Sequence, residues 1–407
     1  MDRLRQDLLG LRLPGRELCT GCGACAAACP RHALLMCSDD EGFLYPNVDA
    51  ELCIRCGRCS AVCPTNHPFP TREPISVWAA RAEDEKIRQE SSSGGVFTLL
   101  AQSMLEDGGV VFGAAFGDGG VGSDRWRVRH VEVTGSDKLG ALRGSKYVQS
   151  DLGTSFRMVL DRLCAHHRVL FVGTPCQTAG LSAYLKATLN ADFQTSRENL
   201  LLVSVICHAA PSPLAWESYL EEESEKGEVA SVAFRDKTCG WTHYQLKVSR
   251  AGGGDTAASA ENHPFLRAFL SELCNRRSCA QCACRNLRTD DDLMLGDYWN
   301  VASRFLDLDD DRGTSLVLVN SSRGEKAWRK IAARVRVKES DWAHAQAVNP
   351  ALIKSTPYTC KRDLFFKRVG HVRFTQLVCS LLQPPWTARM KVKLAHLRNW
   401  LFLRRRP

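Results

Sequence analysis

The sequence predicts a protein of the α+β or α/β class, with a small cysteine-rich head, a larger mixed α/β domain and a basic helical C-terminal tail. Two identical cysteine runs lie before residue 66, and cations dominate residues 361–407. From residue 75 onward, strand-type and helix-type apolar patterns alternate. The expected boundaries are 10–70 for the head, 75–165 and 166–370 for two parts of the large domain, and 371–407 for the tail.

Each cysteine run of the head has the spacing C-x2-C-x2-C-x3-C-P, which is typical of a ferredoxin with two [4Fe-4S] clusters. In this arrangement three thiolates of a run bind one cluster, and the fourth, followed by Pro, binds the other. A zinc ribbon or a disulfide framework is the alternative, but two identical four-cysteine runs fit iron–sulfur ligation better. The expected ligands of the first cluster are Cys19, Cys22, Cys25 and Cys63. The expected ligands of the second cluster are Cys53, Cys56, Cys59 and Cys29.

Length and composition are those of a globular protein with two or three domains. Neither a signal-peptide pattern nor a run of 18 apolar residues occurs, so we expect a cytoplasmic protein. Its 19 cysteines then indicate metal and redox chemistry, because a reducing cytosol keeps thiols free. The net charge of +9 is concentrated in residues 361–407, which carry 12 Lys and Arg against one Asp. No basic groove for nucleic acid is therefore predicted.

A Pro-rich linker at 64–74 separates the head from the large domain, because its prolines cannot continue regular structure. Beyond it, the apolar patterns predict strands and helices in alternation. The expected strands are 77–80, 109–116, 128–133, 169–172 and 200–206. The expected helices are 95–106, 154–165, 179–186 and 213–223. This order predicts an α/β core with some parallel strand pairing, and the glycines at 252–254 predict a hairpin loop.

Six motifs of the large domain follow one another in a characteristic order. They are Ser92-Ser-Gly-Gly-Val-Phe, Arg143-Gly-Ser-Lys-Tyr-Val-Gln, Gly173-Thr-Pro-Cys-Gln-Thr-Ala-Gly, Cys207-His-Ala-Ala-Pro-Ser-Pro, Phe234-Arg-Asp-Lys-Thr-Cys-Gly-Trp and Leu295-Gly-Asp-Tyr-Trp. With these motifs the chain resembles the coenzyme F-420 hydrogenase/dehydrogenase beta-subunit family, with a fused two-cluster head. The resemblance implies an iron–sulfur oxidoreductase that contains FAD in its large domain.

Three segments then form the expected flavin site. Residues 92–95 precede an apolar helix whose N-terminus can receive a phosphate, although an ordinary Ser N-cap explains them equally well. Residues 143–147 place cations and an aromatic ring around a glycine, which suits a pyrophosphate and a flat ring. Residues 173–177 follow a buried strand, at the edge where α/β sheets bind ligands. The expected cofactor-binding residues are Ser92, Ser93, Gly94, Gly95, Arg143, Ser145, Lys146, Tyr147, Thr174, Pro175, Cys176, Gln177 and Asp297.

A third [4Fe-4S] cluster is expected in the large domain, and three of its four expected ligands are closely spaced cysteines. The fourth comes from the end of a predicted strand, and all four match cluster positions of the family. The expected ligands are Cys207, Cys274, Cys279 and Cys282. Cys284 is the alternative to Cys282, because a C-x-C spacing can also reach a cluster.

Catalytic roles are expected at three positions, each with an alternative. Lys237 can hold a negatively charged flavin or substrate, and Asp297 can orient a ribityl hydroxyl or handle a proton. Both residues lie among aromatic residues, so a charged strand end packed on core aromatics explains them equally well. Cys176 can act as a redox thiol, but a buried structural or flavin-lining cysteine is favoured about two to one.

The expected function is electron transfer between a two-electron donor or acceptor, coenzyme F-420 among the candidates, and one-electron carriers through FAD and [4Fe-4S] clusters. The expected partners are a ferredoxin or a partner redox subunit, together with a small-molecule substrate. An electron-relay subunit without its own substrate and a ferredoxin-dependent reductase in polysaccharide or pigment biosynthesis are the alternatives. Residues 386–403 have the pattern of an amphipathic helix. That helix can contact an anionic membrane surface, an acidic partner or its own domain.

Overall fold

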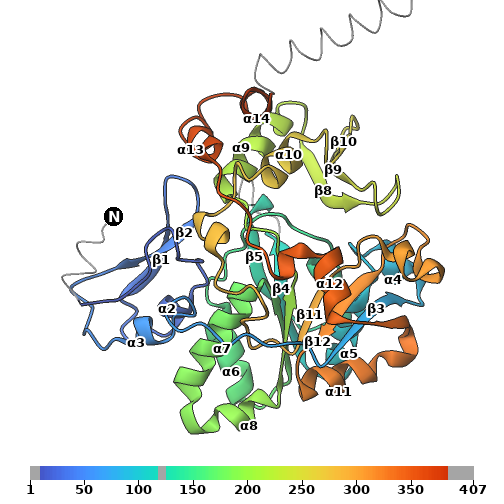
Figure 1. The fold of residues 1–407 in the computed structure, drawn as a ribbon. Coiled ribbons are helices and arrows are strands. Elements are labelled where there is room, and N and C mark those ends of the chain that lie inside the picture. Colours follow the sequence, from blue (N-terminus) through green and yellow to red (C-terminus); the bar gives the residue numbers. More distant parts are fainter. Residues whose placement is uncertain (1–9, 118–124, 384–407) are drawn as a thin grey trace, which may run out of the picture.

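The computed structural model describes residues 10–117 and 125–383 and has a small head beside a larger mixed α/β body (Figure 1). Three sheets build this part of the chain: a two-stranded sheet in the head, an eight-stranded sheet in the body and a three-stranded sheet above it. The predicted fold class is confirmed. The predicted helix at 386–403 lies outside the described residues.

The head repeats in space the two cysteine runs of the sequence. Helices α2 (Ala24–Ala27) and α3 (Arg58–Ala61) each contain the third cysteine of a run. Both helices follow a glycine with positive φ, 73° at Gly23 and 72° at Gly57, a conformation that glycine adopts without steric cost. Strands β1 (Leu34–Ser38) and β2 (Leu44–Val48) join the two halves as an antiparallel hairpin.

The eight-stranded sheet has the order β13-β3-β12-β11-β7-β6-β4-β5. Its strands are β3 (Ser76–Ala82), β4 (Val110–Phe116), β5 (Val128–Val133), β6 (Val169–Gly173), β7 (Leu200–Val205), β11 (Leu293–Asp297), β12 (Ser315–Val319) and β13 (Val335–Ser340). The four central strands β4, β6, β7 and β11 pair in parallel, and the outer strands pair antiparallel. This confirms the predicted parallel pairing. It also explains the continuous apolar runs, because central parallel strands are buried on both faces.

Helices cover both faces of this sheet (Figure 1). Their bounds are α4 (Glu85–Gln89), α5 (Val96–Glu106), α6 (Ser155–Cys164), α7 (Pro175–Leu189), α8 (Phe193–Arg197), α11 (Ser322–Lys330) and α12 (Trp342–Val348). α5 and α11 pack on one face, and α6 and α7 pack on the other. α7 begins four residues before its predicted start, because Thr174 caps it, Pro175 occupies its first turn and Gln177 completes a capping box.

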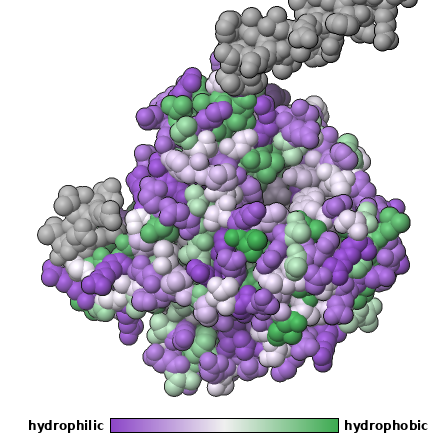
Figure 2. All heavy atoms as spheres, viewed as in Figure 1, coloured by the Kyte–Doolittle hydropathy of each residue, from purple (hydrophilic) through white to green (hydrophobic). Residues whose placement is uncertain are grey.

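A third layer of aromatic residues lies at the upper end of the body in Figure 1. It consists of β8 (Val229–Asp236), β9 (Gln245–Arg250), β10 (Thr256–Ser259), α9 (Pro213–Ser224), α10 (Pro264–Leu270), α13 (Cys360–Phe366) and α14 (Phe374–Leu382). Trp216, Phe234, Phe265 and Phe374 form its centre. Residues 251–255 join β9 to β10, so the predicted hairpin loop is confirmed. Figure 2 shows a mainly hydrophilic face, with a hydrophobic patch near α14.

Arg276 joins the head to the body through a guanidinium group that is almost completely buried. Its Nε donates to the carbonyl of Cys19 at 2.8 Å, and its Nη2 donates to the carbonyl of Leu44 at 3.0 Å. Its Nη1 donates to Gln149 Oε1 of the body at 2.9 Å. A Cβ at Gly21 would lie 2.7 Å from Nη1, so only glycine lets the first cysteine run approach this arginine.

A second buried contact between head and body is the ion pair of Glu41 with Arg362. Arg362 Nη1 donates to Glu41 Oε1 at 2.9 Å, and Arg277 Nη2 donates to the same oxygen at 3.0 Å. Ser212 Oγ donates to the backbone carbonyl of Glu41. These contacts hold the head in one orientation on the body.

Within the described part of the chain, no helix is both long and apolar enough to cross a membrane.

Removal of the Glu41 carboxylate tests the contribution of this buried ion pair to stability. We expect Glu41→Gln to lower the free energy of unfolding by about 3 kcal/mol, because the buried Arg362 guanidinium then loses its close carboxylate and keeps only Asp363, at 3.9 Å. Urea unfolding under anaerobic conditions measures the change. Glu325→Gln is the matched control, since the exposed Glu325–Arg329 pair within α11 should contribute less than about 0.5 kcal/mol. Equal effects of the two substitutions would contradict this account.

Candidate functional site

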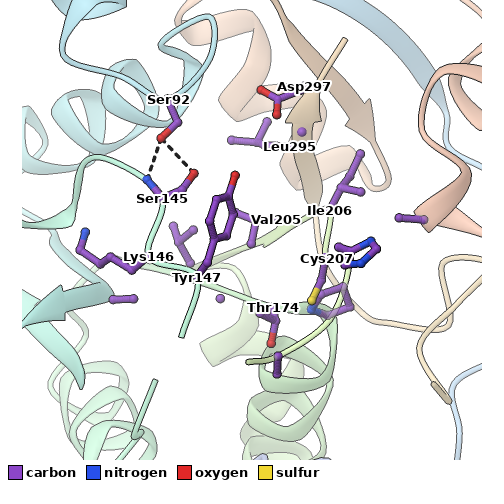
Figure 3. Close-up of a pocket in the computed structure, with 18 of the residues that line it drawn as sticks. Ser92, Ser145, Lys146, Tyr147, Thr174, Val205, Ile206, Cys207, Leu295 and Asp297 are labelled. Carbon is purple, nitrogen blue, oxygen red and sulfur yellow. Dashed lines mark hydrogen bonds between the residues drawn. The ribbon is translucent and has the colours of Figure 1, made fainter. Parts of the chain in front are cut away.

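A cavity of about 700 Å³ lies at the carboxyl ends of the parallel strands. The ends of β6, β7 and β11 all reach its wall, through Gly173, Val205 and Asp297. Ligands bind at this edge in open α/β sheets, because the chain diverges there into loops that carry polar side chains. Figure 3 shows Ser92, Ser145 and Lys146 on one side of the cavity and Cys207 on the other, with Tyr147 between them in this view.

The N-terminus of α5 forms part of the cavity wall. No side chain caps this helix, which begins after Gly95 with a φ of 89°. Ser92 Oγ accepts hydrogen bonds from the amide of Ser145 at 2.7 Å and from Ser145 Oγ at 3.0 Å (Figure 3). Ser93 Oγ donates to the carbonyl of Thr314 at 3.0 Å. The serines therefore fix the surrounding loops, and the alternative of an ordinary Ser N-cap is wrong for α5.

Gly94 is not among the residues that line the cavity in the described structure. A Cβ at this position would lie 2.3 Å from the carbonyl oxygen of Ala80 and 2.7 Å from the amide nitrogen of Ser315. The Gly94 amide also donates to Ser315 Oγ at 3.0 Å. Gly94 has a packing role, because the loop needs glycine to lie against β3 and β12, and its expected contact with a cofactor stays a prediction.

Arg143 and Lys146 bring two cations to the same side of the cavity. Arg143 forms an ion pair with Glu90. Lys146 Nζ donates to the carbonyls of Arg143 at 2.9 Å and Gly144 at 3.3 Å. Burial lowers the pKa of Lys146 to about 8, so the ammonium is still mostly charged at neutral pH. An anion beside it would stabilise that charge.

The turn that follows β6 is held by a hydrogen-bond chain that ends in a buried histidine. Gln177 Nε2 donates to Ser150 Oγ at 2.9 Å, and Ser150 Oγ lies 3.0 Å from His130 Nδ1. His130 Nε2 lies 3.0 Å from the carbonyl of Val172 and therefore carries the proton, so Nδ1 accepts from Ser150. Burial lowers the pKa of His130 to about 4, which keeps the ring neutral. Sequence reasoning missed His130, because a single histidine within a strand has no distinguishing pattern.

Five thiols line the opposite side of the cavity: Cys176, Cys207, Cys279, Cys282 and Cys284. The pKa of Cys207 and that of Cys279 are both raised, the latter to about 12, mainly by burial and also by the nearby thiols. Cys279 Sγ accepts a hydrogen bond from the amide of Ala210 at 3.4 Å. The adjacent Cys284 thiol lowers the pKa of Cys282. These thiols form one group of mutually close side chains.

Cys274 does not belong to this group, in contrast to its expected place in the third cluster. Its side chain is completely buried in the aromatic layer, against neighbours such as Phe269 and Leu273. The charged groups that influence its pKa most are Glu272 and Arg362, and burial raises that pKa. The chain turns after Cys274, and the 3-10 helix Arg277–Gln281 then carries Cys279 toward the cavity. Close spacing in the sequence therefore does not bring Cys274 to the other thiols.

The head contains two further groups of four cysteines. The first group consists of Cys19, Cys22, Cys25 and Cys63. Burial is the largest cause of the raised pKa of Cys22 and of Cys25, and the nearby thiols of Cys19 and Cys63 raise the pKa of both as well. The second group lines a small cavity of about 20 Å³ and consists of Cys29, Cys53, Cys56 and Cys59. In each group the fourth cysteine of one run thus lies beside three cysteines of the other run. Within the described residues, no three His, Cys, Asp or Glu side chains form a site for a single metal ion.

Helix α7 connects the thiols of the cavity with those of the head. Cys176 lies in its first turn, and Gly180 follows one turn later. A Cβ at Gly180 would lie 3.0 Å from Cβ and Sγ of Cys22, so the helix contacts the first cysteine group directly. The nearby Cys176 thiol also raises the pKa of Cys22.

Lys237 and Asp297 have different surroundings, although both were expected at the site. Lys237 Nζ donates to the carbonyls of Arg88 at 2.6 Å and Arg312 at 2.9 Å, and Lys237 is not among the residues that line the cavity. The structure assigns its ammonium group to these two carbonyls, and its expected contact with a flavin or substrate stays a prediction. Asp297 lines the cavity and accepts a hydrogen bond from Arg235 Nη1 at 2.9 Å. Arg235 belongs to the Phe234-Arg-Asp-Lys motif of the sequence, but it was not among the expected site residues.

Comparison with known families gives two adjoining matches to one family, coenzyme F420 hydrogenase/dehydrogenase, beta subunit. The model of its N-terminal part matches residues 77–156, and the model of its C terminus matches residues 166–344. The chain belongs to this family. Two models of a 4Fe-4S dicluster domain match residues 18–67 and 45–98. The protein is thus an iron–sulfur member of the F420 hydrogenase/dehydrogenase beta-subunit family, which is a family of oxidoreductases.

Among solved structures, the chain is similar to one chain from an F420-reducing [NiFe] hydrogenase complex of Methanosarcina barkeri. The two are 17% identical, the match covers 74% of this chain and 92% of the other, and the TM-score is 0.47. No curated protein matches the sequence.

Introduction of a methyl group at residue 94 tests the packing role of Gly94 beside the cavity. We expect Gly94→Ala to lower the free energy of unfolding by about 1–3 kcal/mol, because its Cβ overlaps backbone atoms of β3 and β12. Gly252→Ala is the control, since nothing lies within 4 Å of a Cβ at residue 252. Urea unfolding of both variants measures the difference, and a neutral result for Gly94→Ala would refute the packing role.

Proposed function

We propose that this protein is a flavin-dependent iron–sulfur oxidoreductase. It exchanges two electrons with a small-molecule substrate at the cavity and exchanges single electrons with a protein partner at the head. This proposal depends on one observation: two different sets of groups line opposite sides of the same cavity. An uncapped helix N-terminus and two cations lie on one side, and a group of thiols adjoining the head lies on the other.

FAD fits the polar side of the cavity. The free amide groups at the start of α5 and the cations of Arg143 and Lys146 suit a pyrophosphate, since helix N-termini and cations both stabilise phosphate charge. The aromatic ring of Tyr147 provides a surface for a flat ring. Bound FAD supplies the conversion between two-electron and one-electron chemistry. Asp297 and the loops fixed by Ser92 and Gln177 would position it.

A third [4Fe-4S] cluster fits the thiol side of the cavity. The four proposed ligands are Cys176, Cys207, Cys279 and Cys282, with Cys284 as the alternative to Cys282. Their donor chemistry suits iron, because four cysteine thiolates are the usual ligands of such a cluster. This set replaces Cys274 by Cys176, since Cys274 is packed in the aromatic layer and Cys176 faces the other thiols.

The head would hold two clusters, ligated as the spacing predicts. The cysteine group that contains Cys22 adjoins α7 and forms the inner position, and the group that contains Cys56 forms the outer position. Cys56 is exposed, and so are Arg31, Arg55 and Arg58 beside this group. An acidic redox partner such as a ferredoxin fits this end, because opposite charges accelerate association. Coenzyme F-420 is the proposed substrate at the other end, in accord with the family.

Two cysteine substitutions test the ligands of the third cluster. We expect about twelve iron atoms per wild-type chain, because three clusters contain four each. Cys176→Ser should lower this number to about eight, whereas Cys274→Ser should leave it near twelve. Iron and acid-labile sulfide analysis after anaerobic reconstitution measures both values. The reverse result, with iron lost only in Cys274→Ser, would restore the ligand set expected from spacing.

Flavin binding tests the proposed function itself. We expect the reconstituted protein to retain about one FAD per chain, since the cavity has room and charge for a single dinucleotide. Reduced coenzyme F-420 should then bleach the flavin and cluster absorbance under anaerobic conditions, and NADH serves as the comparison donor. Cluster absorbance without any bound flavin would favour an electron-relay subunit that has no substrate of its own.

A further inference from the structure

Arg235 is a buried cation with two hydrogen-bond donors that have no partner. It lies near the end of β8 and lines the cavity, and only 2% of its side chain is exposed. Nη1 donates to Asp297 Oδ2 at 2.9 Å and to Tyr147 Oη at 3.2 Å. Nε and Nη2 are buried and have no hydrogen-bond partner, and no other side chain of the described chain has two such atoms.

Two unpaired donors on a buried guanidinium are energetically unfavourable, because a charged donor loses its water without gaining a partner. Nε and Nη2 form one edge of the planar group, so their N–H bonds point in nearly the same direction. Such an edge binds two acceptor atoms of one planar anion at the same time. Because Arg235 is among the residues that line the cavity, a ligand there with two adjacent acceptors would satisfy both donors.

Aromatic rings define the shape of that ligand. The Arg235 guanidinium lies over the ring of Tyr244 at 3.9 Å and near Trp299 at 5.2 Å. Trp299 in turn stacks on Trp241, with ring centroids 5.0 Å apart and an angle of 10° between the planes. Tyr147, Tyr244 and Trp299 all line the cavity. These rings keep the guanidinium in one plane and favour a flat, conjugated ligand beside it.

The charge around the unpaired edge favours an anion. The ion pair of Arg235 with Asp297 at Nη1 offsets the charge of the guanidinium but leaves the N–H donors of the Nε–Nη2 edge unpaired. Lys237 lies close enough for electrostatic interaction with both Arg235 and Asp297 and adds a second positive charge. A carboxylate or phosphate would satisfy the charge alone. The aromatic surroundings select instead a delocalised anion within a ring.

We propose that the Nε–Nη2 edge of Arg235 binds the N–C–O edge of the pyrimidine part of a flavin-type ring, with preference for the reduced, anionic form. The proposal rests on the proposed function, because FAD and coenzyme F-420 both carry this ring edge. Arg235 thereby positions the ring and stabilises its negative charge. The experiment below distinguishes the two sources of the ring.

Substitution of Arg235 in the full-length, cluster-reconstituted protein tests the proposal by binding rather than by turnover. Oxidised and reduced FAD are titrated into flavin-free protein, and oxidised and reduced coenzyme F-420 are titrated into FAD-loaded protein, all under anaerobic conditions. We expect Arg235→Gln to weaken binding of the reduced ring by about ten- to hundredfold, and binding of the oxidised ring by less. Arg235→Lys should give a smaller loss, because it keeps the charge but not the two-donor edge.

Arg304→Gln is the matched control, because Arg304 also combines an aspartate partner and a neighbouring aromatic ring, outside the cavity. A selective loss for FAD identifies the flavin as the ligand of Arg235, and a selective loss for coenzyme F-420 identifies the substrate. Iron content reports whether each variant is folded. If Arg235→Gln loses its clusters, the binding measurements are made with Arg235→Lys instead.

Unchanged affinities in a folded Arg235 variant would overturn the role of Arg235 and leave the proposed function intact. Wild-type protein that binds neither ring would overturn the proposed function and, with it, this inference.

Discussion

The buried guanidinium of Arg276 is the contact on which the rest of the arrangement depends. It hydrogen-bonds to backbone carbonyls on both sides of the head and to Gln149 of the body. Arg276 lies three residues before Cys279, so the segment that delivers a thiol to the cavity also anchors the head. This segment therefore links the thiols of the cavity to the head. Gly21 makes the contact possible, because any side chain there would displace the guanidinium.

Helix α7 supplies the second constraint. The capping box of Thr174 and Gln177 fixes where the helix begins, and the hydrogen bonds through Ser150 to His130 fix how that turn lies on the sheet. Cys176 lies in the first turn of the helix, beside the cavity thiols. Gly180 lies in the next turn and contacts Cys22, so one rigid helix connects the two groups. A neutral His130 suits this structural role, because a charged imidazole could not accept from Ser150.

Different structural elements place different chemical groups on the two sides of the cavity. Cations and the α5 N-terminus come from loops on one side. Thiols on the other side come from the segments after β6 and β7 and from residues 279–284, and Arg235 of β8 pairs with Asp297 at the end of β11. The carboxyl ends of parallel strands meet at one edge of the sheet, so the segments after β6 and β7 both reach the cavity. A ligand that spans the cavity would therefore contact phosphate-binding groups at one end and a redox-active group at the other.

The sequence by itself determined the features that depend on local pattern: the repeated cysteine runs, five strands and four helices of the body, and the order of motifs that marks the family. These were predictable because capping, apolar periodicity and cysteine spacing act over a few residues. Only the tertiary structure decided that Cys274 packs among aromatic residues while Cys176 faces the other thiols. It also decided that Gly94 serves packing, that Lys237 binds backbone carbonyls and that Arg235 keeps an unpaired edge. The direction of a side chain depends on which distant segments pack around it, and no local pattern contains that information.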